Sequence, residues 1–254
     1  MSDSTPPDSN SRRAFLQKTS GAIAGAAAMQ TLSCTTVTAQ PKSTEGEFKL
    51  GDYKLDSGVV LADAILGYET HGELNADRSN VILYPTWYTG RHMDNRAAIG
   101  EGRALDPTKY FIIVPDMFGN GLSSSPTNTP SPHDRGRFPL TTTYDNIRAQ
   151  KRLCEEVFGI NKIRSVVGFS MSAQQAFHWG AVYPEMVQSI APICGSAKTS
   201  PHDWLHLEGM KRALQTDPNW EDGDYEKPPE AGLRAFHTVS GGWFLSQAYC
   251  RKGK

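Results

Sequence analysis

Three short stretches of the chain are largely apolar, and each is followed by a glycine or a proline: residues 81–84, 110–114 and 163–167. Stretches that are apolar on both faces are typical of buried parallel strands. An earlier stretch, 59–70, mixes alternating and continuous apolar positions, which favours a partly exposed antiparallel strand. Residues 144–158 repeat apolar side chains at helical spacing, with Asp145 near the start, where its charge suits the helix dipole. Strands that alternate with a helix predict a doubly wound α/β sheet.

The segment 166–179 joins the last buried strand to an apolar helix through a serine between small residues. A nucleophile elbow needs a serine on a strained turn, with small residues two positions before and after it so that the backbones can approach. Gly168 and Ser172 fill these places around Ser170, which we predict to be a nucleophile. Glycine is usual at the second place, so we expect a slightly more crowded elbow. A serine that only caps the helix is the alternative.

Two loops at the ends of the other buried strands support the elbow. Residues 116–123 read D-x-x-G-x-G-x-S, a turn frequent in α/β hydrolases, and they lack the third glycine of a dinucleotide fingerprint. Residues 84–90 lie where such folds place a backbone donor for an oxyanion. We therefore predict the backbone N–H groups of Met171 and Tyr88 as oxyanion donors, with Trp87 as the alternative to Tyr88. A plain aromatic loop packed on a cap would explain the same residues.

Five separated segments together resemble the homoserine O-acetyltransferase family of α/β hydrolase-fold enzymes: residues 66–75, 102–106, 148–150, 168–174 and 217–225. The resemblance covers about residues 49–246. It implies that Ser170 takes an acyl group from a small-molecule substrate and passes it to a hydroxyl acceptor or to water. Acetyl-coenzyme A is one acyl donor that the resemblance allows. The family's G-G-S-M-G-G elbow and H-A-L-T-G loop differ here at residues 168–173 and 86–90, which leaves homoserine specificity open.

The acid and the histidine of the triad follow the serine in chain order in this fold, after the last strands of the sheet. Residues 188–194 predict the strand after the elbow helix, and no further buried strand follows. The later histidines are expected to be surface or packed residues and supply no general base: His178, His202, His206 and His237. A chain that ends at Lys254 is therefore expected to be C-terminally truncated or frameshifted, and almost inactive.

The alternative to catalysis is a dead fragment or a non-catalytic binding module of the same fold. An unpaired strand at the end of the sheet would expose backbone donors and an apolar face. Such an edge favours aggregation or pairing with another chain, so a homo-oligomer is compatible with the sequence.

The first 39 residues predict an export signal. Arg12 and Arg13 precede a weakly apolar Ala/Gly segment of the twin-arginine type, which is too short for the roughly 20 residues of a membrane span. A surface helix with a chance arginine pair is the alternative. The signal predicts a periplasmic protein, or a cytoplasmic one if it is not used, and export favours water or a small alcohol as acceptor. Residues 40–195 then form an incomplete hydrolase core, and 196–254 a partial helical cap.

Charge balance and residue spacing limit which binding partners, metals and disulfides we expect. The 254 residues carry 26 basic and 27 acidic side chains, and a net charge of −1 provides no field that would collect nucleic acid. His202 and His206 lack the glutamate and third ligand of a zinc-protease helix, so neither a metal nor a cofactor is expected. The spacing of the four cysteines indicates no disulfide framework, and Cys154 is expected to be buried in its helix.

Overall fold

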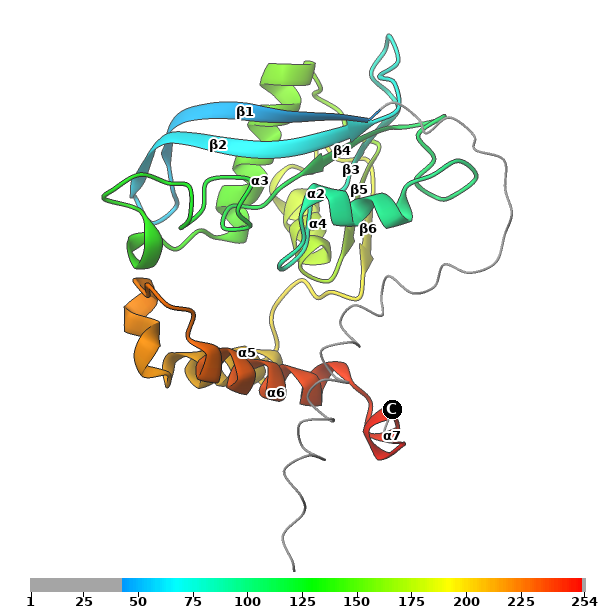
Figure 1. The fold of residues 1–254 in the computed structure, drawn as a ribbon. Coiled ribbons are helices and arrows are strands. Elements are labelled where there is room, and N and C mark those ends of the chain that lie inside the picture. The colour runs from blue at the N-terminus through cyan, green and yellow to red at the C-terminus, as the bar shows by residue number, and fades with distance from the viewer. Residues whose placement is uncertain (1–42, 253–254) are drawn as a thin grey trace, which may run out of the picture. The chain divides into compact units, whose positions relative to one another are not determined.

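The computed structural model describes residues 43–252, so the export signal predicted for residues 1–39 lies outside the described residues. Contacts between Cα atoms divide the described chain into two compact units. The larger unit consists of residues 43–200 with 222–224 and contains the sheet (Figure 1). The smaller unit consists of residues 201–221 with 225–252 and is helical.

Six strands form a single sheet in the larger unit (Figure 1): β1 (Ser43–Lys54), β2 (Val60–His71), β3 (Val81–Leu83), β4 (Phe111–Pro115), β5 (Ser165–Phe169) and β6 (Ile190–Ile193). Their order is β1-β2-β4-β3-β5-β6; the first two pairs are antiparallel and the other three are parallel. The predicted, mostly parallel α/β sheet is confirmed. Strand β1 was not predicted, because most of its side chains are exposed and its hydrophobic pattern is weak.

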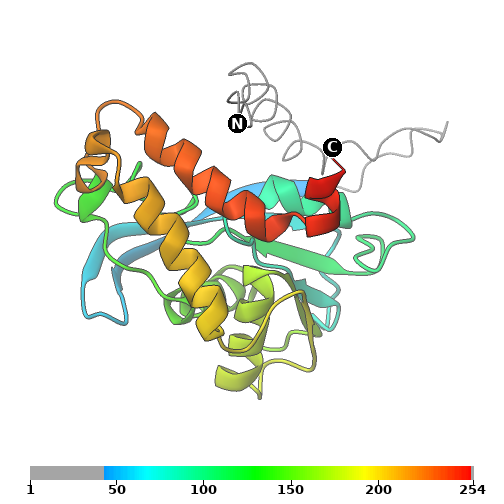
Figure 2. The same ribbon diagram turned by 90° about the horizontal axis from the view of Figure 1, so that it is seen from below.

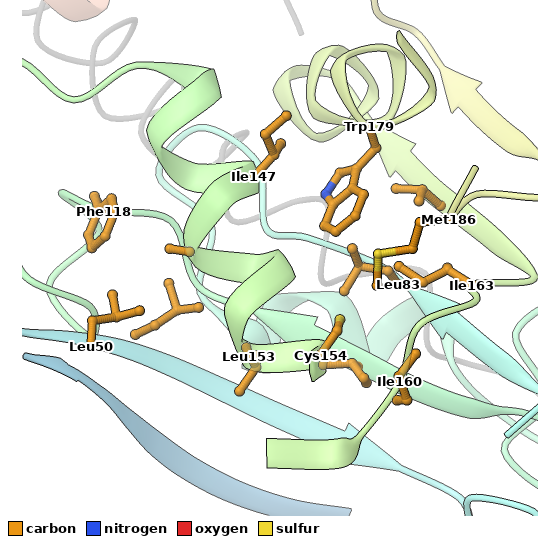
Figure 3. Packing of buried hydrophobic residues seen from close by; sticks show 14 of the residues in the cluster. Leu50, Leu83, Phe118, Ile147, Leu153, Cys154, Ile160, Ile163, Trp179 and Met186 are labelled. Atoms are coloured by element: carbon orange, nitrogen blue, oxygen red, sulfur yellow. The ribbon is translucent and has the colours of Figure 1, made fainter. Parts of the chain in front are cut away.

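Neighbouring residues on the central strands point to opposite faces of the sheet, and both kinds are buried. On β3, Leu83 belongs to the larger core cluster and Ile82 to the smaller one. Ile113 and Ile112 divide in the same way on β4. Trp179, which is 0% exposed, extends into the larger cluster (Figure 3). Burial on both faces explains why these strands are apolar at nearly every position.

Two helices of the larger unit contribute to this core: α3 (Thr143–Arg152) and α4 (Met171–Val182). Helix α3 begins with a capping box, in which Asp145 N donates to Thr142 Oγ1 at 3.1 Å and Thr142 N donates to Asp145 Oδ2 at 2.9 Å. It continues as a π-helical turn over Leu153–Val157, so the single helix predicted over 144–158 consists of two pieces. Cys154 is fully buried, as predicted. The short helix α2 (His92–Asn95) follows the loop after β3.

In the smaller unit, α5 (Pro201–Gln215) and α6 (Glu230–Phe244) lie side by side, and α7 (Gln247–Arg251) follows (Figure 2). A 3₁₀ turn (Pro218–Gly223) comes after α5. The Gly232 amide donates to Asp217 Oδ2 at 2.9 Å, and this bond lowers the pKa of Asp217. A Cβ on Gly232 would lie 2.4 Å from the Leu214 carbonyl oxygen, so glycine is needed where the two helices approach. No helix within residues 43–252 is long and apolar enough to cross a bilayer.

Candidate active site

The predicted nucleophile, Ser170, stands at the junction of β5 and α4. Its backbone has φ 56° and ψ −121°, which is strained for a residue with a Cβ. Ser170 N donates to the Ile193 carbonyl on β6 at 2.9 Å. A serine that caps a helix usually has an extended backbone and accepts an amide hydrogen with its side chain. The half-buried Ser170 makes no such bond, so the structure shows a strained turn and not a helix cap.

Close backbone contact shapes this elbow. A Cβ on Gly168 would lie 2.2 Å from the Ser172 carbonyl oxygen and 2.5 Å from Ala173 N, so no larger residue fits without a shift of α4. The Ser172 side chain is fully buried, and its hydroxyl donates to the Pro85 carbonyl at 2.6 Å. Ser172 therefore ties α4 to the loop after β3.

The loop of residues 84–90 is held by its carbonyl groups. Gln175 Nε2 on α4 donates to the Thr86 carbonyl at 2.9 Å. The Trp87 ring is half-buried and meets the Phe169 ring edge-on, with the centroids 6.1 Å apart. Tyr88 is 51% exposed. The aromatic packing that we considered as the plain interpretation of this loop thus applies to the Trp87 ring.

A cavity of about 270 Å³ adjoins the elbow. It is lined by residues 87–89, 117–120 and 141–143 together with Asn146, Met171 and Gln175. Met171 begins α4, and the first amides of a helix have no partner within it. The three residues predicted to supply oxyanion donors, Met171, Tyr88 and Trp87, therefore border one cavity. The sequence did not single out Asn146 and Gln175 as cavity residues, because single polar residues on a helix follow no pattern. The only signal is their position: Asn146 follows Asp145 at the start of α3, and Gln175 follows the elbow.

The described residues around the elbow fall within a known family. The α/β hydrolase fold family matches residues 80–246, which include the elbow, the loop after β3 and every residue of the cavity. The chain belongs to the α/β hydrolase family.

Relatives of this α/β hydrolase include both esterases and acetyltransferases. An ethyl acetate hydrolase of Pseudomonas veronii is 43% identical over 188 residues, which cover 72% of this chain and 54% of that protein. A homoserine O-acetyltransferase of Geobacter sulfurreducens is 33% identical over 213 residues, covering 77% and 57%. The solved structure of an acetylester hydrolase from Corynebacterium glutamicum has a TM-score of 0.79 at 38% identity, covering 82% of this chain and 61% of that one.

The resemblance to homoserine O-acetyltransferases is thus confirmed, while the two esterases are more similar to this chain. The chain spans little more than half the length of the curated relatives it matches.

The predicted D-x-x-G-x-G-x-S turn, part of which lines the cavity, supports the loop of residues 84–90. Asp116 is fully buried, and its Oδ2 lies 2.6 Å from His92 Nδ1. This hydrogen bond raises the pKa of His92. The other Asp116 oxygen accepts from His92 N at 2.9 Å and from Asn120 Nδ2 at 2.7 Å. Asn120 also donates to the Gly90 carbonyl at 3.1 Å, so the turn and the loop are held together.

A charged cluster that the sequence did not predict links β1, β2 and the turn after α2 around one buried carboxylate. Glu69 is 0% exposed, and both of its carboxylate oxygens accept from Arg96 Nε at 3.0 Å. Arg96 also bonds Glu45 at 2.6 Å, and His71 Nε2 lies 3.3 Å from Glu69. Burial lowers the pKa of His71. Because a buried carboxylate is costly without a partner, Arg96 explains how Glu69 is accommodated here.

The histidines that follow the elbow contact other groups. His178 Nδ1 lies 3.0 Å from a carbonyl one turn earlier on α4. The ring centroids of His202 and His206 each lie 4.5 Å from that of Trp243. The His237 ring contacts the ring of Phe236, its neighbour on α6. Between residues 43 and 252, no hydrogen bond joins a histidine to the elbow serine. The general base therefore stays unassigned.

Proposed function

We propose that this α/β hydrolase cleaves small esters through an acyl-enzyme formed on Ser170. The observation that carries the proposal is the strained, half-buried serine whose neighbour Met171 borders the same cavity as Trp87 and Tyr88. A volume of about 270 Å³ is below the usual range of drug-sized pockets, which favours a short acyl group. Relatives named for ethyl acetate and acetyl esters are more similar to this chain than the acetyltransferase is, which favours water as the acceptor.

The reaction has two balanced steps. Ser170 Oγ attacks the ester carbonyl carbon, and the bond to the alcohol oxygen breaks, so that the alcohol leaves with the serine proton. Water then attacks the acyl-enzyme, the bond to Oγ breaks, and the acid is released as Ser170 regains a proton. In each step the carbonyl oxygen gains negative charge, which the amides of Met171 and of Tyr88 or Trp87 would stabilise. An exported protein meets little acetyl-coenzyme A, so the export signal that we predict also favours hydrolysis.

A non-catalytic module of the same fold is the second candidate. The observation that favours it is the absence, within residues 43–252, of a histidine hydrogen-bonded to the elbow serine. Without a base a serine hydroxyl is a weak nucleophile, and loss of a triad base costs on the order of 10⁶ in turnover in a protease example.

Irreversible labelling measured beside ester hydrolysis distinguishes the two candidates, because labelling requires a reactive serine hydroxyl but no deacylation by water. We would treat the chain with an alkyl fluorophosphonate, locate the adduct by peptide mass spectrometry, and measure hydrolysis of p-nitrophenyl acetate in parallel. We expect a single adduct on Ser170 and an ester hydrolysis rate that falls to background in Ser170→Ala. Ser189→Ala, which removes an exposed hydroxyl bonded to the Arg164 carbonyl, is the matched control and should leave both readouts unchanged.

An adduct on Ser170 without ester hydrolysis would favour the non-catalytic candidate in a chain that has a competent elbow. If no adduct forms, or if it is spread over several serines, the elbow is not a nucleophile site and the proposed function is wrong.

A further inference from the structure

Buried amide groups connect the core to the loop of residues 84–90. Trp179 Nε1 donates to Gln150 Oε1 at 2.9 Å, and Gln150 Nε2 donates to Gln175 Oε1 at 2.7 Å. Gln175 Nε2 then donates to the Thr86 carbonyl at 2.9 Å. The three side chains are at most 1% exposed, so water does not compete for these bonds. We call this chain of bonds the amide relay; it runs from α4 to α3, back to α4, and then to the loop.

The first member fixes the direction of every bond in the relay. An indole N–H can only donate, so Gln150 must turn its oxygen to Trp179 and its NH₂ group to Gln175. Gln175 must then accept with its oxygen, which leaves its NH₂ group for the Thr86 carbonyl and for Met117 Sδ at 3.0 Å. A reversed amide would set two acceptors or two donors face to face in a buried site, at a high cost. Only one arrangement satisfies all the groups.

This arrangement determines how one peptide group of the loop is oriented. A peptide group is planar and trans, so its C=O and N–H point in opposite directions. The Thr86 carbonyl points at Gln175, and the N–H of the same peptide belongs to Trp87, which borders the cavity. We infer that Gln150 and Gln175 are positioning residues that hold the peptide between Thr86 and Trp87 in one orientation and so place the oxyanion donors that the loop supplies. The inference rests on the proposed function, because it presumes acyl transfer at Ser170.

A carboxyl group at position 150 tests the direction of the relay. In the Gln150→Glu variant the ionised carboxylate can only accept hydrogen bonds. The Gln175 side-chain amide must then reverse in order to donate to it, which turns the Gln175 oxygen toward the Thr86 carbonyl. Protonated Gln150→Glu donates to Gln175 and restores the original direction. Burial raises the pKa of a carboxyl group, so the change should fall between about pH 5 and 8. Gln150 does not line the cavity, so the substituted side chain itself does not contact the acyl group.

The readout is the rate constant for fluorophosphonate labelling of Ser170 at saturating reagent, because the phosphonyl oxygen occupies the oxyanion position. At high pH we expect Gln150→Glu to react at least about tenfold more slowly than the unsubstituted chain, since displaced donors cost one to three orders of magnitude. At acid pH the labelling rate of Gln150→Glu should return to within about threefold of the rate of the unsubstituted chain at the same pH. Gln150→Leu should be slow at every pH, and Gln188→Glu, the same change at an exposed position, should follow the unsubstituted chain.

A purely structural role would lower stability without producing acid recovery of the labelling rate. If Gln150→Glu does not fold, as judged by circular dichroism, Trp179→Phe removes the indole donor together with part of the buried ring volume and should slow labelling at least about threefold. Equal rates for the unsubstituted chain and the relay variants, with no adduct in Ser170→Ala, would overturn the relay alone. No labelling of the unsubstituted chain would overturn the proposed function, and the relay with it.

Discussion

Substitution of Gly168 by alanine should damage the elbow more than any other single-methyl change in the sheet. The new Cβ would lie 2.2 Å from the Ser172 carbonyl oxygen, whereas real Cβ atoms keep at least 3.0 Å, so strand and helix must separate by about 0.8 Å. The opposing atoms are backbone in the first turn of α4, where Ala173 N bonds the Ser170 carbonyl at 2.9 Å, so no rotamer change relieves the overlap. Overpacking typically costs 1–3 kcal/mol, and we expect about 3 kcal/mol here.

At 2–4 °C per kcal/mol for a chain of this size, Gly168→Ala should lower the melting temperature by about 6–12 °C. It should also slow labelling of Ser170 about 100-fold, because the serine moves relative to the loop of residues 84–90. Gly180→Ala on the same helix is the control: its Cβ meets only the Ile190 side chain at 3.3 Å, so we expect melting within about 3 °C of the unsubstituted chain. If Gly168→Ala melts and labels like this control, close backbone contact does not shape the elbow.

Three further predictions concern buried groups of the larger unit. Ser172→Ala removes the 2.6 Å bond to the Pro85 carbonyl, which still accepts from Asn95 Nδ2 at 3.3 Å, and should cost about 0.5–1.5 kcal/mol in urea unfolding; an unchanged midpoint would contradict it. The Thr108 hydroxyl holds the pKa of Asp106 at about 2, below its ordinary 3.8, so the stability it contributes should be lost as pH falls from about 4 to 2, and Asp106→Asn should flatten that slope. Burial raises the pKa of Cys154 to about 12, so at pH 8 iodoacetamide should modify the exposed cysteines and spare Cys154 until the chain unfolds.

The buried strands and the elbow could be predicted because their physical causes are local. Burial on both faces leaves a continuous apolar sequence, and this pattern located β3, β4 and β5 to within a few residues. Small residues around Ser170 marked the elbow for an equally local reason, since the contact between Gly168 and the Ser172 backbone spans only four positions. The capping box of α3 had the same kind of local cause, although only Asp145 was recognised.

The relay and the charged cluster could not be predicted, because their partners are far apart in the chain. Gln150 and Gln175 are 25 residues apart, and Gln175 and Thr86 are 89 apart. Nothing in the sequence near a single glutamine shows which carbonyl the fold will bring to it. For the same reason Glu69 and Arg96, which are 27 positions apart, read from sequence as ordinary strand and turn residues. Polar pairing is settled by topology, and the hydrophobic pattern carries no information about it.

Under the proposed function, the loop of residues 84–90 has two tasks: its backbone supplies an oxyanion donor, and its side chains form part of the cavity wall. Different contacts control the two. Its backbone is anchored at carbonyl groups by Ser172 and Gln175 of α4, and the loop's own side chains take no part in either bond. Trp87 and Tyr88 stand where the family has alanine and leucine. These side chains can therefore change the wall of the cavity without moving the backbone N–H groups of the loop. One oxyanion site can in this way serve both esterases and acetyltransferases, with acyl specificity set by loop side chains and donor geometry by α4. An exchange of Trp87 for alanine should accordingly alter the preferred acyl length of the ester more than the rate on the best ester.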